Sequence, residues 1–180
     1  MTLRAGALGL VLVCALTGCS GDSGGEPQSL PPVTPGPTTL APSPTTSPSA
    51  YPQTPQGAAD FARFVYAEID RAYQTRDPEV IRPLFADACA ACKNFVTSLE
   101  RIRERGLTVD GRAARVVSAE SPGSELPQVV TVQLDYGGIR FLDPLGQVVA
   151  EEPAGEFQDE MTLERAEASW LVTSINRVSP

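Results

Sequence analysis

Prolines divide this chain into a part that can build a hydrophobic core and a part that cannot. Ten of the seventeen prolines lie between Ser20 and Gln56, among many serines and threonines and few large apolar residues. This composition cannot bury enough apolar surface to fold, and closely spaced prolines favour extended polyproline II segments. Residues 19–53 are therefore predicted to be a disordered tether with a reach of about 100 Å at ~3.1 Å per residue. The alternative is a proline-rich recognition motif or a glycosylated stalk, with candidate positions at Thr38, Thr39, Thr45 and Thr46.

The segment before the tether has the pattern of a lipoprotein signal peptide. Arg4 precedes an uncharged apolar run over residues 5–16, and the cleavage region is Leu16-Thr17-Gly18-Cys19. About 12 residues cover roughly 18 Å as a helix, well short of a ~30 Å hydrocarbon core, so a transmembrane helix is disfavoured. An apolar residue, two small residues and cysteine match a lipobox, whose thiolate accepts diacylglycerol. We expect cleavage of residues 1–18 and lipidation of Cys19, which would anchor the protein to the extracytoplasmic face of the cell membrane. An ordinary signal peptide with a coincidental cysteine is the alternative.

The remaining residues, 54–180, are predicted to form one globular domain that begins with three helices. Thr54-Pro55 and Asp77-Pro78 each supply an N-cap followed by proline at the first helical position. Apolar residues spaced by three and four favour amphipathic helices after Thr54, over residues 79–85 and after Cys92. Their inward faces are expected to hold Ala58, Phe61, Ala62, Val65, Ile69, Ala72, Val80, Ile81, Leu84, Phe85, Phe95, Val96, Leu99 and Ile102.

Beyond Gly106 the period of the apolar residues changes from helical to alternating, and β-branched residues become frequent. A turn is expected at residues 143–146, where Asp, Pro and Gly occupy the positions that a type I turn favours. Helices followed by an antiparallel sheet indicate an α+β fold. We therefore expect three helices packed on one face of a single curled, cone-like sheet. Its four or five strands are predicted over residues 107–120, 128–136, 139–150, 157–166 and 170–178.

Three short motifs lie within residues 51–178: Tyr51-Pro52 with Pro55, Gly57-Ala58 and Phe61, then Cys89-x-x-Cys92, then Trp170-x-Val172. Together they resemble an uncharacterised family of actinobacterial lipoproteins, known only as a domain of unknown function. This resemblance implies no substrate. The order of elements also resembles the cone of nuclear-transport-factor-2-like proteins, in which a curled sheet wraps helices around a pocket; as a fold, this implies no particular function.

Two cysteines remain after the predicted processing, Cys89 and Cys92, because Cys14 leaves with the signal peptide and Cys19 carries the lipid. Outside the cytoplasm such a pair is expected to form a disulfide at the junction between the second and third helices. Closing this short loop would stabilise the folded domain by about 2 kcal/mol. A thiol–disulfide oxidoreductase is the alternative. It is disfavoured because residues 79–85 are predicted to be helical, whereas a thioredoxin-like unit has a strand there.

The sequence contains no histidine, which excludes Ser-His-Asp and Cys-His nucleophilic systems. Zinc is disfavoured because two cysteines without histidine leave a tetrahedral site half empty. A catalytic pair such as Asp135 and Tyr136 is disfavoured because adjacent residues of a strand face opposite sides. No catalytic residue, metal or cofactor is therefore predicted. An acidic stretch is expected to be a solvated hairpin edge in preference to a calcium site; it comprises Glu151, Glu152, Glu156, Asp159 and Glu160.

The net charge of −8, which becomes −9 once Arg4 is removed, argues against nucleic acid as a partner. The predicted partners are the membrane, through the covalent lipid, and an envelope protein or small ligand. The favoured function is a non-catalytic binding module of the cell envelope. The alternatives are a pocket enzyme of isomerase or hydrolase type that uses carboxylates and, less favoured, a redox module that uses Cys89 and Cys92.

Overall fold

The computed structural model describes residues 51–167 and 169–178, so the predicted signal peptide, Cys19 and most of the tether lie outside the described residues. The first helix, α1, spans Pro55–Thr75 and begins where the sequence predicts. Thr54 is its N-cap and accepts a hydrogen bond from the amide of Gly57 at 3.1 Å. All six residues predicted for its inward face are buried, which confirms the amphipathic pattern.

The predicted second helix consists of two short 3-10 helices, η2 (Pro78–Val80) and η3 (Arg82–Leu84). Asp77 caps η2 as expected, with Oδ1 accepting a hydrogen bond from the Glu79 amide. A regular α-helix is disfavoured here because Pro83 has no amide hydrogen and restricts the residue before it. The predicted third helix is α2 (Ala90–Glu104), which starts slightly earlier than the sequence suggests.

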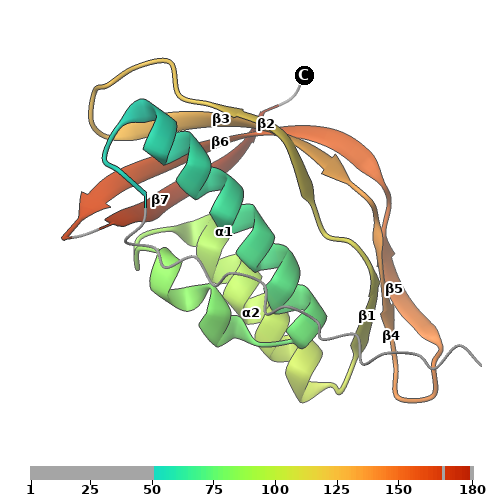
Figure 1. Cartoon of the computed structure of the whole chain (residues 1–180). Helices are drawn as coiled ribbons and strands as arrows, with labels where there is room; N and C mark the ends of the chain where they lie inside the picture. Colours follow the sequence, from blue (N-terminus) through green and yellow to red (C-terminus); the bar gives the residue numbers. More distant parts are fainter. Residues whose placement is uncertain (1–50, 168, 179–180) are drawn as a thin grey trace, which may run out of the picture. The chain divides into compact units, whose positions relative to one another are not determined.

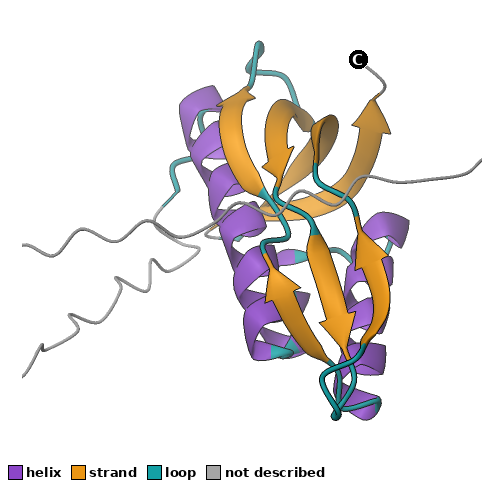
Figure 2. Ribbon diagram, turned by 90° about the vertical axis from the view of Figure 1, so that its right-hand side faces the viewer, coloured by secondary structure: helices purple, strands orange, loops and turns teal. Residues whose placement is uncertain are grey.

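Seven strands follow the helices and form two antiparallel sheets, with the orders β2-β3-β6-β7 and β1-β4-β5. Figure 2 shows the two sheets following one another along the helices. The α+β class and the order of helices before strands are therefore confirmed. The strands are β1 (Thr108–Gly111), β2 (Arg115–Glu120), β3 (Gln128–Tyr136), β4 (Ile139–Leu142), β5 (Val148–Glu152), β6 (Gly155–Ala166) and β7 (Ser169–Val178).

Seven strands in two sheets correct the prediction of four or five strands in a single sheet. The division results from interruptions that lie side by side in the connections between the two sheets. Three segments that connect the two sheets belong to no strand: residues 112–114, 137–138 and 153–154. Gly138 has a φ of 78°, and Pro153 has no amide hydrogen, so neither continues a regular ladder. The layer of strands therefore bends sharply between its two sheets as it curves around α1 and α2 (Figure 1).

The chain enters the described domain along a short segment that packs on α1 and β7. Tyr51 lies edge-on to Phe61, with ring centroids 5.7 Å apart. The Nε1 of the buried Trp170 donates a hydrogen bond to the carbonyl of Pro52 at 3.1 Å. A Cβ on Gly57 would lie 1.9 Å from that same Pro52 oxygen, so the approach requires glycine. Residues 51–53, assigned to the tether by the sequence, thus pack against the domain, and two of the three resemblance motifs meet here.

No helix within residues 51–167 and 169–178 is both long and apolar enough to cross a lipid bilayer.

Candidate ligand-binding cavity

A cavity of about 520 Å³ lies at the bend between the two sheets. Helices α1 and α2 close one side of it, and the ends of β3, β5, β6 and β7 close the other. Its aromatic lining consists of Tyr66, Tyr73, Phe95, Tyr136 and Phe157. Its polar lining consists of Asn94, Ser98, Glu152, Asp159 and Arg177. Three residues of the interruptions between the sheets, Ala113, Ala114 and Pro153, contribute to the lining.

Asp159 on β6 is a buried carboxylate in the cavity wall, with only 3% of its surface exposed. The hydroxyl of Tyr66 on α1 donates a hydrogen bond to its Oδ2 at 2.7 Å, and Nε of Arg177 on β7 contacts its Oδ1 at 3.1 Å. A buried charge is costly unless it is paired and hydrogen-bonded. Donors from two further elements therefore meet that requirement and connect α1 to β6 and β7.

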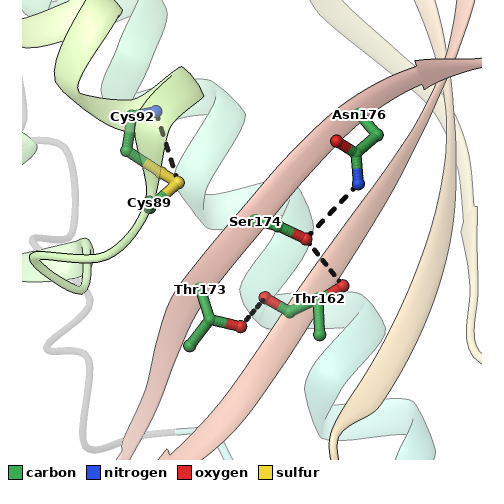
Figure 3. Close-up of a disulfide and its surroundings, with 6 residues drawn as sticks. All are labelled: Cys89, Cys92, Thr162, Thr173, Ser174 and Asn176. Atoms are coloured by element: carbon green, nitrogen blue, oxygen red, sulfur yellow. Dashed lines mark hydrogen bonds between the residues drawn. A yellow bond between two sulfur atoms is a disulfide. The ribbon is translucent and has the colours of Figure 1, made fainter.

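A bulge in β7 turns Arg177 toward this carboxylate. The register between β6 and β7 shifts next to Thr162, so Thr173 is an extra residue, and its hydroxyl donates to the Thr162 carbonyl at 3.3 Å (Figure 3). Beyond the bulge, Ile175 and Arg177 line the cavity. A regular strand would direct Asn176 inward instead, because side chains alternate between faces. The bulge thus supplies the cation that neutralises the buried carboxylate.

A second tyrosine–carboxylate pair lies at the mouth of the cavity. The hydroxyl of Tyr136, at the end of β3, donates to Oε2 of Glu152 on β5 at 2.5 Å. The ring of Tyr136 packs edge-on to Phe157, with centroids 6.0 Å apart. Arg177 lies over the same Phe157 ring, with its guanidinium carbon 4.1 Å from the centroid. Glu152 itself is exposed to solvent.

The cavity keeps its tyrosines in the neutral, hydrogen-donating form. Burial, and then the adjacent Asp159 carboxylate, raise the pKa of Tyr66 far above its usual value. Burial and the hydrogen bond to Glu152 raise the pKa of Tyr136 in the same way. Burial and the charge of Glu152 raise the pKa of Tyr73 to about 12, although Ser98 acts in the opposite direction. Tyrosines held this way donate hydrogen bonds and do not act as bases near neutral pH.

Asp135 and Tyr136 lie on opposite faces of β3, as expected from the sequence, where this alternation disfavoured them as a catalytic pair. Tyr136 lines the cavity, whereas Asp135 points to the other face of β3 and pairs with Arg115 at 2.9 Å. The prediction that the acidic stretch is solvated is wrong for Asp159, which is buried. It holds for Glu152, which is exposed, but it did not anticipate that Glu152 lines the cavity. The other three acidic residues of that stretch are exposed. In the described part of the chain, no three Cys, Asp or Glu side chains converge in a way that could hold a metal ion.

The sulfur atoms of Cys89 and Cys92 lie at bonding distance, 1.99 Å apart, at the start of α2 (Figure 3). Cys89 is also the N-cap of α2, and its Sγ accepts a hydrogen bond from the Cys92 amide at 3.3 Å. Both cysteines are 1% exposed. Thiol–disulfide exchange needs an accessible sulfur, so this burial favours a structural disulfide over a redox site.

Residues 34–176 match a family described as a family of unknown function, DUF6318. No curated protein sequence gives a significant match. Similar solved structures include the intermembrane-space region of the chloroplast protein ARC6, which is 13% identical with a TM-score of 0.47 over 68% of this chain and 97% of that chain.

Two bacterial structures show a similar degree of likeness. An NTF2-like protein from Cytophaga hutchinsonii is 12% identical with a TM-score of 0.43, over 67% of this chain and 97% of that chain. A protein of unknown function from Mycobacterium tuberculosis is 12% identical with a TM-score of 0.42, over 68% of this chain and 73% of that chain. None of these likenesses carries an activity, ligand or partner over to this chain.

Proposed function

Because the chain belongs to DUF6318, a family of unknown function, we propose its role from the cavity: it is a non-catalytic module that binds a small amphipathic ligand at the cell envelope. The volume of about 520 Å³ falls in the range of about 300 to 1,000 Å³ that is usual for small-molecule sites. Its walls are mainly aromatic and apolar, with a few polar groups that would orient a ligand. Such a lining suits a molecule with an apolar body and a polar end.

The observation that carries the proposal is the state of Asp159. Each of its oxygens accepts a hydrogen bond, one from the Tyr66 hydroxyl and one from Arg177, and only 3% of the residue is exposed. A general base must come within hydrogen-bond reach of the proton it removes. Because this carboxylate is buried and bonded to the wall through both oxygens, its position favours a structural role over that of a base.

Glu152 is the observation that favours a second candidate function, an isomerase or hydrolase that uses a carboxylate. It is exposed at the cavity mouth, and Oε1 accepts no hydrogen bond within the described residues. If this candidate is correct, the full chain should convert a component of an envelope extract into a product. The Glu152→Gln variant should then lose that conversion while it still binds the component.

The location at the envelope is proposed from the N-terminal sequence. A lipid on Cys19 and the proline-rich residues 19–50 would hold the domain near, but not against, the membrane surface. The acidic net charge supports the same arrangement, because anionic headgroups would repel the domain.

The binding proposal is tested by titrating the full chain with naphthalenemethanol, an uncharged probe with an aromatic body. Calorimetry is expected to detect saturable binding. Asn94→Trp, which places a large side chain at a lining position of α2, should weaken that binding by about tenfold or more.

Lys93→Trp is the matched control, because Lys93 is the exposed neighbour of Asn94 on α2 and does not line this cavity. It should leave the affinity for the probe unchanged. No saturable binding to the wild type, or equal losses in the two variants, would overturn the proposal.

A further inference from the structure

Glu152 is the one charge in the cavity lining that no opposite charge compensates within the described residues. The other two charged lining residues, Asp159 and Arg177, pair with each other at 3.1 Å. Glu152 accepts a hydrogen bond from Tyr136, but a hydroxyl brings no formal charge. No Lys or Arg among residues 51–167 and 169–178 lies within 4.0 Å of its carboxylate. The cavity therefore has a net charge of about −1 at neutral pH.

Aromatic side chains line the cavity together with that charge, and one of them already has a cation over its ring. The guanidinium of Arg177 lies 4.1 Å from the centroid of the Phe157 ring. Tyr136 packs against Phe157 and donates its hydroxyl hydrogen to Glu152 at 2.5 Å, and Tyr73 lines the same cavity. A carboxylate beside aromatic faces is the combination that stabilises an organic cation, through Coulomb attraction and the ring quadrupole together.

We propose that the ligand of this cavity is an organic cation, in which a protonated amine or guanidinium contacts Glu152 and an apolar body packs among Tyr73, Tyr136 and Phe157. This inference rests on the proposed binding function and adds the chemical class of the ligand. The free Oε1 of Glu152 accepts the N–H of the cation while Oε2 keeps its bond to Tyr136.

Arg177 offers the opposite possibility, a ligand with a carboxylate, and the structure favours it less. Its charge is already balanced by Asp159, so an anion bound there would face that buried carboxylate as well as Glu152. The repulsion between an anionic ligand and two carboxylates outweighs its attraction to the single exposed guanidinium.

Three probes with the same aromatic body separate these possibilities when each is titrated calorimetrically into the full chain at neutral pH. They are naphthylmethylamine, naphthalenemethanol and naphthoic acid, which carry a positive, a neutral and a negative end. We expect the amine to bind about five- to tenfold more tightly than the alcohol, and the acid to bind most weakly. Added salt should weaken the binding of the amine and leave the binding of the alcohol unchanged.

Glu152→Gln should remove the preference for the amine and leave the affinity for the alcohol within about twofold of the wild type. Glu156→Gln is the matched control, since it removes the same charge from the same hairpin but on the face of β6 opposite to Phe157. It should keep the wild-type order of affinities.

The two proposals fail in different ways. If none of the three probes binds, the binding function itself is wrong. If the alcohol or the acid binds as tightly as the amine, or if Glu156→Gln has the same effect as Glu152→Gln, the cavity is a binding site but the cation assignment is overturned.

Discussion

Asp159 shows how single residues hold this domain together at the cavity. It is a buried carboxylate with one donor on each oxygen, Tyr66 from α1 and Arg177 from β7. Arg177 is 56% exposed and screened by water, so the buried hydroxyl of Tyr66 is the donor that water cannot easily replace. The link between the helix layer and the sheet therefore depends strongly on one hydroxyl group.

Tyr66→Phe should lower the free energy of unfolding by about 1 to 3 kcal/mol, because it leaves an oxygen of a buried carboxylate without its donor. Denaturant unfolding of the full chain at neutral pH measures the change. Tyr51→Phe is the matched control, since no described residue accepts a hydrogen bond from the Tyr51 hydroxyl, and it should cost much less. Similar losses for both variants would mean that the Asp159 contact contributes nothing specific.

The tyrosines also predict a decline of stability at alkaline pH. All four have a raised pKa, chiefly through burial, with that of Tyr73 at about 12. An unfolded chain releases tyrosine protons near pH ~10, whereas the folded domain retains them to higher pH. The stabilising effect is therefore complete below pH ~10 and is lost as the pH rises toward the folded values.

Ultraviolet absorbance of tyrosinate, followed together with circular dichroism, tests this expectation. The part of the tyrosinate signal that comes from the buried Tyr66 and Tyr73 should appear above pH ~10 and together with the loss of native circular dichroism. A tyrosinate signal that titrates near pH ~10 in a fully native domain would contradict the burial of these hydroxyls.

Part of this residue-level arrangement was accessible from the sequence. Phe157, Asp159, Met161 and Leu163 alternate along the strand predicted over residues 157–166, so Asp159 occupies an inward position of an otherwise apolar face. That signal indicates a buried carboxylate with partners. Its partners were not predictable, because Tyr66 lies 93 positions away in the chain and only the packing of α1 on β6 brings the two together.

At the scale of elements, the sequence predicted those features that depend on neighbouring residues, such as helix caps and regular strands. Thr54 and Asp77 cap their helices as expected, and β3 has the predicted bounds because its alternation is regular. The bulge at Thr173 and the bend between the sheets were missed. Both arise from the register between strands that are distant in sequence, and a bulge leaves the composition of a strand unchanged. A pocket was expected only from the resemblance to a cone-like fold, and its lining was not predictable, since Ala113, Ala114 and Pro153 of the bend contribute to it.

The junction between the entering chain and α1 leads to an element-scale prediction in which two effects have opposite signs. Helix propensity alone predicts that Gly57→Ala stabilises α1 by up to about 1 kcal/mol. The added Cβ, however, would lie 1.9 Å from the Pro52 oxygen and would displace the segment that bonds to Trp170. We expect the steric effect to dominate, with a net loss of about 1 to 3 kcal/mol in the free energy of unfolding.

Gly123→Ala provides the comparison, because the nearest atom to its added Cβ lies 3.9 Å away in an exposed loop. Thermal unfolding should show a lower midpoint for Gly57→Ala and almost no change for Gly123→Ala. A stabilised Gly57→Ala protein would show that the contact of Pro52 with the helix start is unimportant.

At the scale of the whole domain, the point of chain entry and the cavity lie at opposite ends of β6. Gln53 exchanges hydrogen bonds with Ala166 and Arg165 at the end of this strand. Phe157 and Asp159, near its start, line the cavity. About six to nine residues of strand separate the two, which corresponds to roughly 20 to 30 Å. A domain tethered through its N-terminal segment would therefore have its cavity remote from the attachment point.

The proposed attachment itself leads to a prediction about Cys19. If its thiol carries diacylglycerol, Cys19→Ser removes the nucleophile that accepts the lipid. The variant should then be released into the medium or accumulate as an unprocessed precursor, and it should no longer incorporate radiolabelled palmitate. Acyl chains contribute about 0.8 kcal/mol per buried CH₂, so a processed protein that lacks two or three of them should not be retained stably at the membrane.

Cys14→Ser is the matched control for this experiment. Cys14 lies within the apolar run that the sequence assigns to the signal peptide, so its replacement should change neither the mass of the mature protein nor its membrane fraction. Unchanged retention and unchanged mass in Cys19→Ser would exclude the lipid anchor and, with it, the proposed position of the cavity at the envelope.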